Sequence, residues 1–231
     1  MLYRGLLATI SLLATAGSLP AQTPPSPPPP AASAPAVETT NSPEPMEDVQ
    51  TGDHWTYEVR DQIAGELRST ITNTVTDVSA KEIGMRLTFL GKPNFGFQTL
   101  DRSWNFVDSG DWRYAPNDGT GIQPPLAVGK AWSIKATDTN RTGGFSWKRS
   151  STSKVTATES VTTQAGTFEA FKIVTSIQLQ NTNDPTKKVQ IEQQTWYVPA
   201  IDHWAKRTFV SRSEGKVREN VSHELIEYGR R

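Results

Sequence analysis

Three histidines are the residues in this chain best suited to bind a metal. The tripeptide Asp-His-Trp occurs twice and contains His54 and His203, and the third histidine is His223. Imidazoles and carboxylates are ligands for zinc and iron, so these residues could form a site if the fold brought them together. On an alternating strand with Trp55 directed inward, however, His54 faces solvent, and nothing in the sequence makes the three histidines converge. We therefore predict no metal and no cofactor, and keep the histidines only as candidates.

Two short motifs resemble parts of a nucleophilic active site. Residues 151–154 read Ser-Thr-Ser-Lys, which fits Ser-x-x-Lys, and residues 141–143 could imitate the Lys-Thr-Gly strand of penicillin-recognising enzymes. In those enzymes the nucleophile precedes that strand and begins a helix, whereas here the order is reversed and the context is a strand. The chain also has no Gly-x-Ser-x-Gly, no His-Glu-x-x-His and no cysteine. We predict no catalytic residue, although a carboxylate pair assembled by folding, with Glu192 and Glu224 as examples, stays open.

Tryptophan is the remaining residue type that could contact a ligand. All seven tryptophans follow residue 45, and most should fill the core. Trp104 and Trp112 flank or occupy an irregular region, and Trp147 lies among polar and basic residues. Exposed rings of this kind can stack on sugars or line an apolar groove. These three are the predicted ligand-binding residues, with packing under a loop as the alternative.

The elements that would position these residues are β-strands. From Met46 onward, large apolar residues alternate with polar ones, as in half-buried strands. The expected strands lie at residues 54–60, 71–78, 83–89, 132–136, 145–149, 154–159, 168–180, 189–198, 204–211 and 221–228. Gly- and Asn-rich turns separate them, and no segment has helix caps at both ends. We predict an all-β domain over residues 46–231, formed by one curved antiparallel sheet or half-barrel.

Two further features of this domain have alternative interpretations. Residues 52–56 and 129–133 are similar and 77 residues apart, which indicates either two related halves or chance similarity. Residues 107–125 form a long segment with several carboxylates, three glycines and three prolines. Their spacing does not match the calcium-binding loop, so ordinary turn chemistry is favoured over a metal site.

The first 45 residues predict export. Residues 1–21 combine a basic tip, a short apolar run and small residues, as in a signal peptide. Residues 22–45 contain nine prolines and almost no large apolar side chain, so they form a disordered spacer, with a proline-motif ligand as the alternative. Without cysteine there is no residue to carry a bacterial lipid anchor. The mature chain is expected in the periplasm or outside the cell, not lipid-anchored, and without a transmembrane segment.

Net charge excludes one class of partner. The formal charge is zero for the whole chain and minus one after removal of the signal, whose only charged residue is Arg4. Strong attraction to phosphate backbones is not expected, so nucleic acid is not a predicted partner. The oligomeric state does not follow from the sequence.

Four segments of the domain resemble a known family. They are Pro125-Leu-Ala-Val-Gly-Lys-Ala-Trp132, Ala165-Gly-Thr-Phe-Glu-Ala-Phe-Lys-Ile173, Trp196-Tyr-Val-Pro-Ala-Ile-Asp-His-Trp-Ala-Lys206 and Glu224-Leu-Ile-Glu-Tyr228. Together they resemble exported bacterial TapB-like proteins over residues 126–228. The resemblance implies a β-rich protein grouped by shape with the half-barrel carriers of lipoproteins. Two departures are the Ala-Ile-Asp-His turn at residues 200–203, commonly Gly-rich in the family, and the lack of amphipathic helices to cover the sheet.

These observations favour binding over catalysis. The preferred function is a non-catalytic envelope protein that holds a hydrophobic small molecule or lipid on its concave sheet. The alternative is a module that binds carbohydrate or cell-wall polysaccharide through its exposed tryptophans. A hydrolase without a recognisable motif is the third possibility.

Overall fold

The described part of the protein is an all-β domain. The computed structural model describes residue 46 and residues 48–230, so the predicted signal peptide and spacer lie outside the described residues. The strands are β1 His54–Asp61, β2 Leu67–Val78, β3 Glu82–Phe89, β4 Phe95–Asp101, β5 Phe106–Asp108, β6 Trp112–Ala115, β7 Ala131–Asn140, β8 Ser146–Thr163, β9 Gly166–Asn181, β10 Lys188–Val198, β11 His203–Ser213 and β12 Lys216–Gly229. One 3₁₀ turn, Pro199–Ile201, joins β10 to β11. Within these residues no helix has the length and apolar character needed to cross a membrane.

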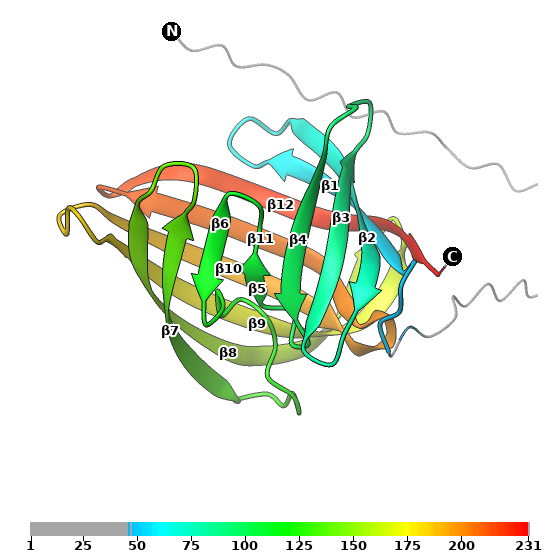
Figure 1. Ribbon diagram of the computed structural model, residues 1–231. Coiled ribbons are helices and arrows are strands. Elements are labelled where there is room, and N and C mark those ends of the chain that lie inside the picture. Colours follow the sequence, from blue (N-terminus) through cyan, green and yellow to red (C-terminus); the bar gives the residue numbers. More distant parts are fainter. Residues whose placement is uncertain (1–45, 47, 231) are drawn as a thin grey trace, which may run out of the picture. The chain divides into compact units, whose positions relative to one another are not determined.

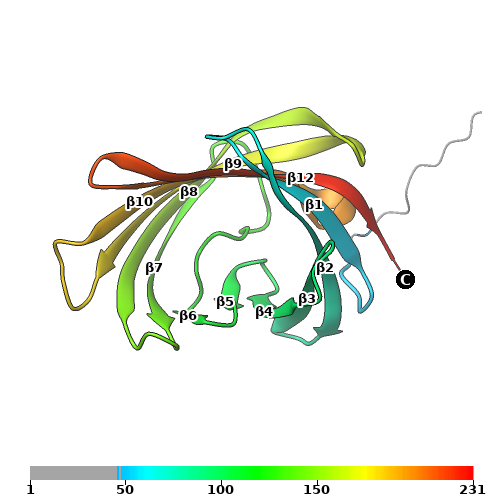
Figure 2. The same ribbon diagram turned by 90° about the horizontal axis from the view of Figure 1, so that it is seen from above.

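The strands close into an antiparallel barrel in which each strand pairs with its neighbours in sequence (Figures 1 and 2). Closure comes from the pairing of β1 with β12, which runs from His54 opposite Gly229 to Asp61 opposite Val221. On the other side of the barrel the short strands β5 and β6 bridge β4 and β7. The predicted half-barrel is therefore wrong. A closed barrel also needs no covering helices, because its inner face is already shielded from water.

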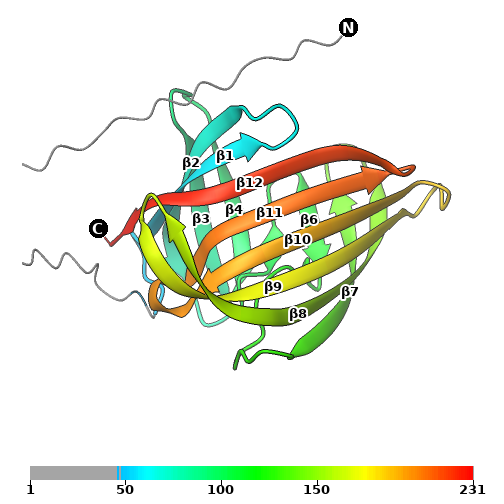
Figure 3. The ribbon, with the colours of Figure 1, turned by 180° about the vertical axis from the view of Figure 1, so that it is seen from behind.

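Along the long strands, buried side chains alternate with exposed ones. In β8, buried Arg149, Ser151, Ser153 and Val155 alternate with exposed residues, so one face of the strand lines the interior. The sequence predicted two strands, at residues 145–149 and 154–159, but β8 is continuous and absorbs an irregular register between Val155 and Ala157. Figure 3 shows that β8 to β12 form the long wall of the barrel.

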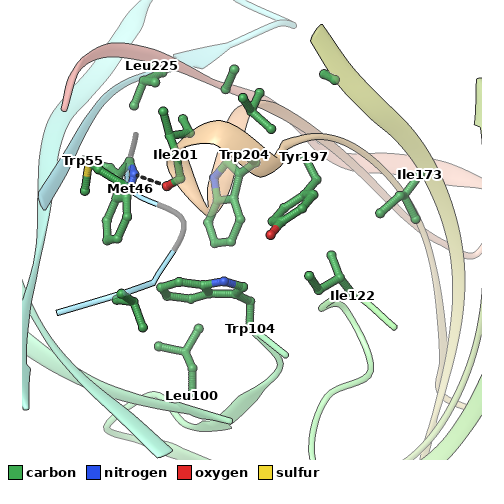
Figure 4. Packing of buried hydrophobic residues seen from close by; sticks show 14 of the residues in the cluster. Met46, Trp55, Leu100, Trp104, Ile122, Ile173, Tyr197, Ile201, Trp204 and Leu225 are labelled. Carbon is green, nitrogen blue, oxygen red and sulfur yellow. Dashed lines mark hydrogen bonds between the residues drawn. The ribbon is translucent and has the colours of Figure 1, made fainter. Parts of the chain in front are cut away.

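The two ends of the barrel differ. The turns after odd-numbered strands, at residues 62–66, 90–94, 109–111, 141–145, 182–187 and 214–215, belong to one end, which we call the mouth end. The opposite end, which we call the packed end, contains the 3₁₀ turn and the turn at residues 102–105. There the indole of Trp55 donates to the carbonyl of Ile201 at 3.2 Å, and Trp55 and Trp104 meet edge to face (Figure 4). Met46 is also buried there, and its backbone nitrogen donates to the carbonyl of Ala200.

The region at residues 107–125 is not one irregular loop, as the sequence suggested. It contains the end of β5, the whole of β6 and a segment that turns into the barrel, where Asp118, Thr120 and Ile122 are buried. The amide of Asp118 donates to the carbonyl of Phe106, and that of Ile122 donates to Ser103. This segment therefore forms part of the interior wall and not an exposed loop.

Candidate functional site

One cavity formed by the described residues lies inside the barrel. Its volume is about 420 Å³, within the range of small-molecule sites. Seven apolar side chains from β2, β3, β5 and β9 to β12 line it, namely Ile71, Leu87, Phe106, Ile177, Ile191, Phe209 and Val221. Polar side chains also converge on it, above all Arg149 and Arg207. The cavity therefore combines an apolar wall with a few charged groups.

Arg207 projects into this cavity from β11 and is only 8% exposed. Its Nε donates to the Thr195 hydroxyl at 3.1 Å, and its Nη2 makes a long contact of 3.5 Å with the carbonyl of Thr120. The guanidinium carbon lies 3.6 Å from the centre of the Trp204 ring, a cation–π contact. These contacts fix the plane of the guanidinium.

Burial sets the protonation of the groups around Arg207. Desolvation lowers the pKa of Arg207 to about 10, so its side chain is charged at neutral pH. His223 lies directly opposite Arg207 in the β11–β12 register and also lines the cavity. Desolvation and the charge of Arg207 lower the pKa of His223 to about 4, which leaves its imidazole neutral at pH 7.

The second arginine of the cavity, Arg149 on β8, is neutralised by a buried carboxylate. Its Nε donates to both oxygens of Asp138 at 2.9 and 3.0 Å, and its Nη2 donates to one of them at 2.6 Å. Such a paired fork is a strong and directional contact.

A second carboxylate, Asp118, also lines the cavity. Burial raises the pKa of Asp118, whose oxygens accept hydrogen bonds from the amides of Phe106 and Thr120 and from the Thr120 hydroxyl.

A second pocket of about 410 Å³ continues toward the mouth end. Tyr114 and Arg149 line both pockets. The other apolar residues of the second pocket are Trp112, Phe145, Trp147, Leu179 and Val189. Trp112 and Phe145 meet edge to face with ring centroids 5.6 Å apart. The shared residues make the two pockets neighbours along the inner face of the barrel.

The three tryptophans selected from the sequence do not share one environment. Trp112 and Trp147 are half-buried and line the second pocket together. Trp104 is 1% exposed and packs at the packed end, where its indole donates to Asp202 at 3.0 Å. The expectation that Trp104 presents an exposed ring is therefore wrong, because the turn between β4 and β5 directs it into the core. Ligand contact by Trp112 and Trp147 stays a prediction.

The structure does not bring the three histidines together. His54 was expected to face solvent, but it is 7% exposed and its Nε2 lies 2.8 Å from a Glu227 oxygen, because β12 covers this end of β1. His203 is fully buried at the packed end, stacked on Trp55 and hydrogen-bonded to Tyr57 at 2.5 Å. His223 faces the cavity instead. Among the described residues no group of three potential metal ligands occurs, and this includes the carboxylates at 107–125.

The charged residues of the cavity were not predicted from the sequence. Arg207 alternates with Ala205 and Phe209 on the inward face of β11, and Arg149 occupies an inward position of β8. For Arg207, the available signal was a charged residue that alternates with apolar ones. Its meaning depends on closure of the barrel, because only closure removes these side chains from water.

Comparisons with known proteins support the barrel fold. A family model described as DUF3108-like matches residues 135–202, inside the region that resembles TapB-like proteins. No curated protein matches this chain. Among solved structures, a candidate lipoprotein from Parabacteroides distasonis is similar, with a TM-score of 0.52, 13% identity, and coverage of 80% of this chain and 97% of that chain. A candidate exported protein with YmcC-like fold from Bacteroides fragilis has a TM-score of 0.51 and 14% identity, and the match covers 81% of this chain and 98% of that chain. The TapB-like assignment stays a prediction, and the two structural neighbours support the fold alone.

Proposed function

We propose that this protein is an exported binding protein that holds a hydrophobic or lipid-like ligand inside its barrel. The observation that carries the proposal is the interior cavity of about 420 Å³, whose wall includes seven apolar side chains and the rings of Tyr57, Tyr114 and Trp204. An apolar ligand that leaves water for such a site gains roughly 25 cal/mol for each Å² of apolar surface buried. The ligand thus lies inside a closed barrel and not on an open concave sheet.

The envelope location is part of the same proposal. It rests on the signal-like residues 1–21 and on the description of the two structural neighbours as a lipoprotein and an exported protein.

A neutral fluorescent probe tests the proposal directly. N-phenyl-1-naphthylamine should bind the purified chain with enhanced emission. Ile191→Trp should weaken this binding, because Ile191 is 9% exposed and lines the cavity. Glu192→Trp, at the neighbouring exposed position of β10, is the matched control and should bind normally. Circular dichroism checks that both variants fold. Equal binding by the two variants, or no binding by the unaltered chain, would contradict an interior site.

A second candidate function is binding of cell-wall polysaccharide. It is favoured by the half-buried rings of Trp112, Phe145 and Trp147 near the mouth end. Sedimentation with peptidoglycan discriminates between the two functions. Binding to peptidoglycan that is lost in Trp112→Ala and Trp147→Ala, together with failure to bind the apolar probe, would favour the polysaccharide function.

A further inference from the structure

We propose that the ligand is an amphiphile whose head group carries an oxyanion, a carboxylate or a phosphate, and that Arg207 binds this head group. The inference rests on the proposed function and specifies the ligand of the same cavity. The charged side chains that line the cavity are those of Arg149, Arg207, Asp118 and Glu219.

Arg207 differs in its partners from Arg149, the other buried arginine of the described residues. Arg149 is held by the carboxylate of Asp138, and Glu219 is paired with Arg68 at 2.8 Å. Arg207 forms no ion pair with the described residues, although it is only 8% exposed. Placing a cation in such an environment is costly unless an anion contacts it. A ligand oxyanion would supply that contact.

The remaining N–H groups of Arg207 are free to donate to a ligand oxyanion. Nε is used by Thr195 and Nη2 contacts the carbonyl of Thr120, whereas Nη1 makes no hydrogen bond to the described residues. The Trp204 ring covers one face of the guanidinium, so an oxyanion must approach in its plane. Planar approach to paired N–H groups is the geometry in which arginine binds carboxylate and phosphate.

Asp118 does not occupy this position. Its charge acts to raise the pKa of Arg207, but both of its oxygens already accept hydrogen bonds from Phe106 and Thr120. His223, across from Arg207, is neutral and neither cancels nor repels an anion. The apolar residues Ile177, Ile191 and Phe209 line the same cavity, and the second pocket offers further apolar surface. One end of the ligand would thus meet Arg207 and the other would meet hydrocarbon.

The test compares head groups on one chain length. Binding of laurate, dodecyl phosphate, dodecanol and dodecylamine to the purified chain is measured at neutral pH by displacement of N-phenyl-1-naphthylamine. At least one of the two anions should bind about tenfold tighter than dodecanol or dodecylamine, since a hydrogen bond to a charged group contributes on the order of one tenfold step or more. The better of laurate and dodecyl phosphate identifies the carboxylate or the phosphate.

Two variants assign the preference to Arg207. Arg207→Met should lose the preference for anions and still bind dodecanol, and its removal leaves the Thr195 hydroxyl bonded to Gln193. Lys206→Met is the matched control, because Lys206 pairs with Glu224 and lies over Trp196, outside the residues that line the cavity. It removes the same charge and should keep the preference. Arg207→Lys, which retains a cation without the planar fork, should give an intermediate preference.

The outcomes separate the two proposals. Equal affinity of the unaltered chain for anions and dodecanol would overturn the head-group inference and leave the apolar site intact, as would a preference that survives in Arg207→Met. If none of the four amphiphiles binds, the proposed function itself fails and the inference fails with it. The comparison on the unaltered chain decides the matter even if Arg207→Met does not fold.

Discussion

At the scale of single residues, buried ionisable groups give this barrel a pH-dependent stability. His223 has a pKa of about 4 in the folded chain, against 6.5 for a solvated imidazole. Between these values the unfolded chain binds more protons than the folded one, so stability is full above pH 6.5 and is lost as pH falls toward 4. The shift corresponds to about 3 kcal/mol in all.

We therefore expect His223→Gln to unfold with a shallower pH dependence than the unaltered chain. Urea unfolding at pH 7.5 and pH 4.5 measures the difference in free energy. His203, also buried and with a lowered pKa, contributes a slope of the same sign in both proteins and serves as an internal reference. Parallel pH dependences in the two proteins would contradict the buried, neutral state of His223.

Asp118 permits a second prediction at this scale. Its charge opposes an anionic head group near Arg207, so Asp118→Asn should strengthen laurate binding by about fivefold, as expected for about 1 kcal/mol of screened repulsion. The asparagine oxygen can still accept from the amides of Phe106 and Thr120. Dodecanol affinity is the control and should not change. A uniform change for both ligands would indicate altered packing instead of altered charge.

At the scale of elements, the barrel has a weak seam. β4 pairs with β5 at two positions, β5 pairs with β6 at one, and β6 pairs with β7 at four. In contrast, β8 and β9 pair along sixteen positions, from Trp147 opposite Asn181 to Thr163 opposite Gly166. Few ladder bonds to neighbouring strands lower the free energy of local opening.

Amide hydrogen exchange should consequently be fastest at Phe106–Asp108 and Trp112–Ala115 among the strands. The central parts of β8, β9 and β10 should exchange only through global unfolding. Mass spectrometry of peptides from these segments measures the rates. Because β6 contributes Trp112 and Tyr114 to the second pocket, an amphiphile that fills this pocket should slow exchange in β6 most. Equal protection of β6 and β9 in the free chain would contradict the seam.

The same seam explains what the sequence could and could not predict. Alternation located β1, β2, β3, β7 and β9 to β12, and stripes of apolar residues such as Ile83, Met85 and Leu87 were the signal. It located β8 only as two shorter strands, because Ser151 and Ser153 occupy its inward positions. It missed β4, where Phe95 and Phe97 are exposed and only Leu100 is a buried apolar residue, and β5 and β6, which are too short to display a period. These three strands complete the circle, so their omission turned a barrel into a half-barrel. The cavity residues could be located on strands, but their convergence depends on the β1–β12 pairing, which joins residues far apart in sequence.

At the scale of the whole molecule, the two neighbouring pockets predict how affinity depends on ligand length. Each methylene that enters an apolar site contributes about 0.8 kcal/mol, or roughly a fourfold gain in affinity. With the head group at Arg207, chains long enough to pass Tyr114 and Arg149 should gain further from the second pocket. In Trp147→Ala the gain should stop at shorter chains, because that pocket loses part of its wall. Displacement titrations with fatty acids of about 8 to 18 carbons measure how affinity depends on chain length in the unaltered protein and in Trp147→Ala. The shortest acids should bind the two proteins equally, and identical curves throughout would place the ligand tail elsewhere than beside Trp147.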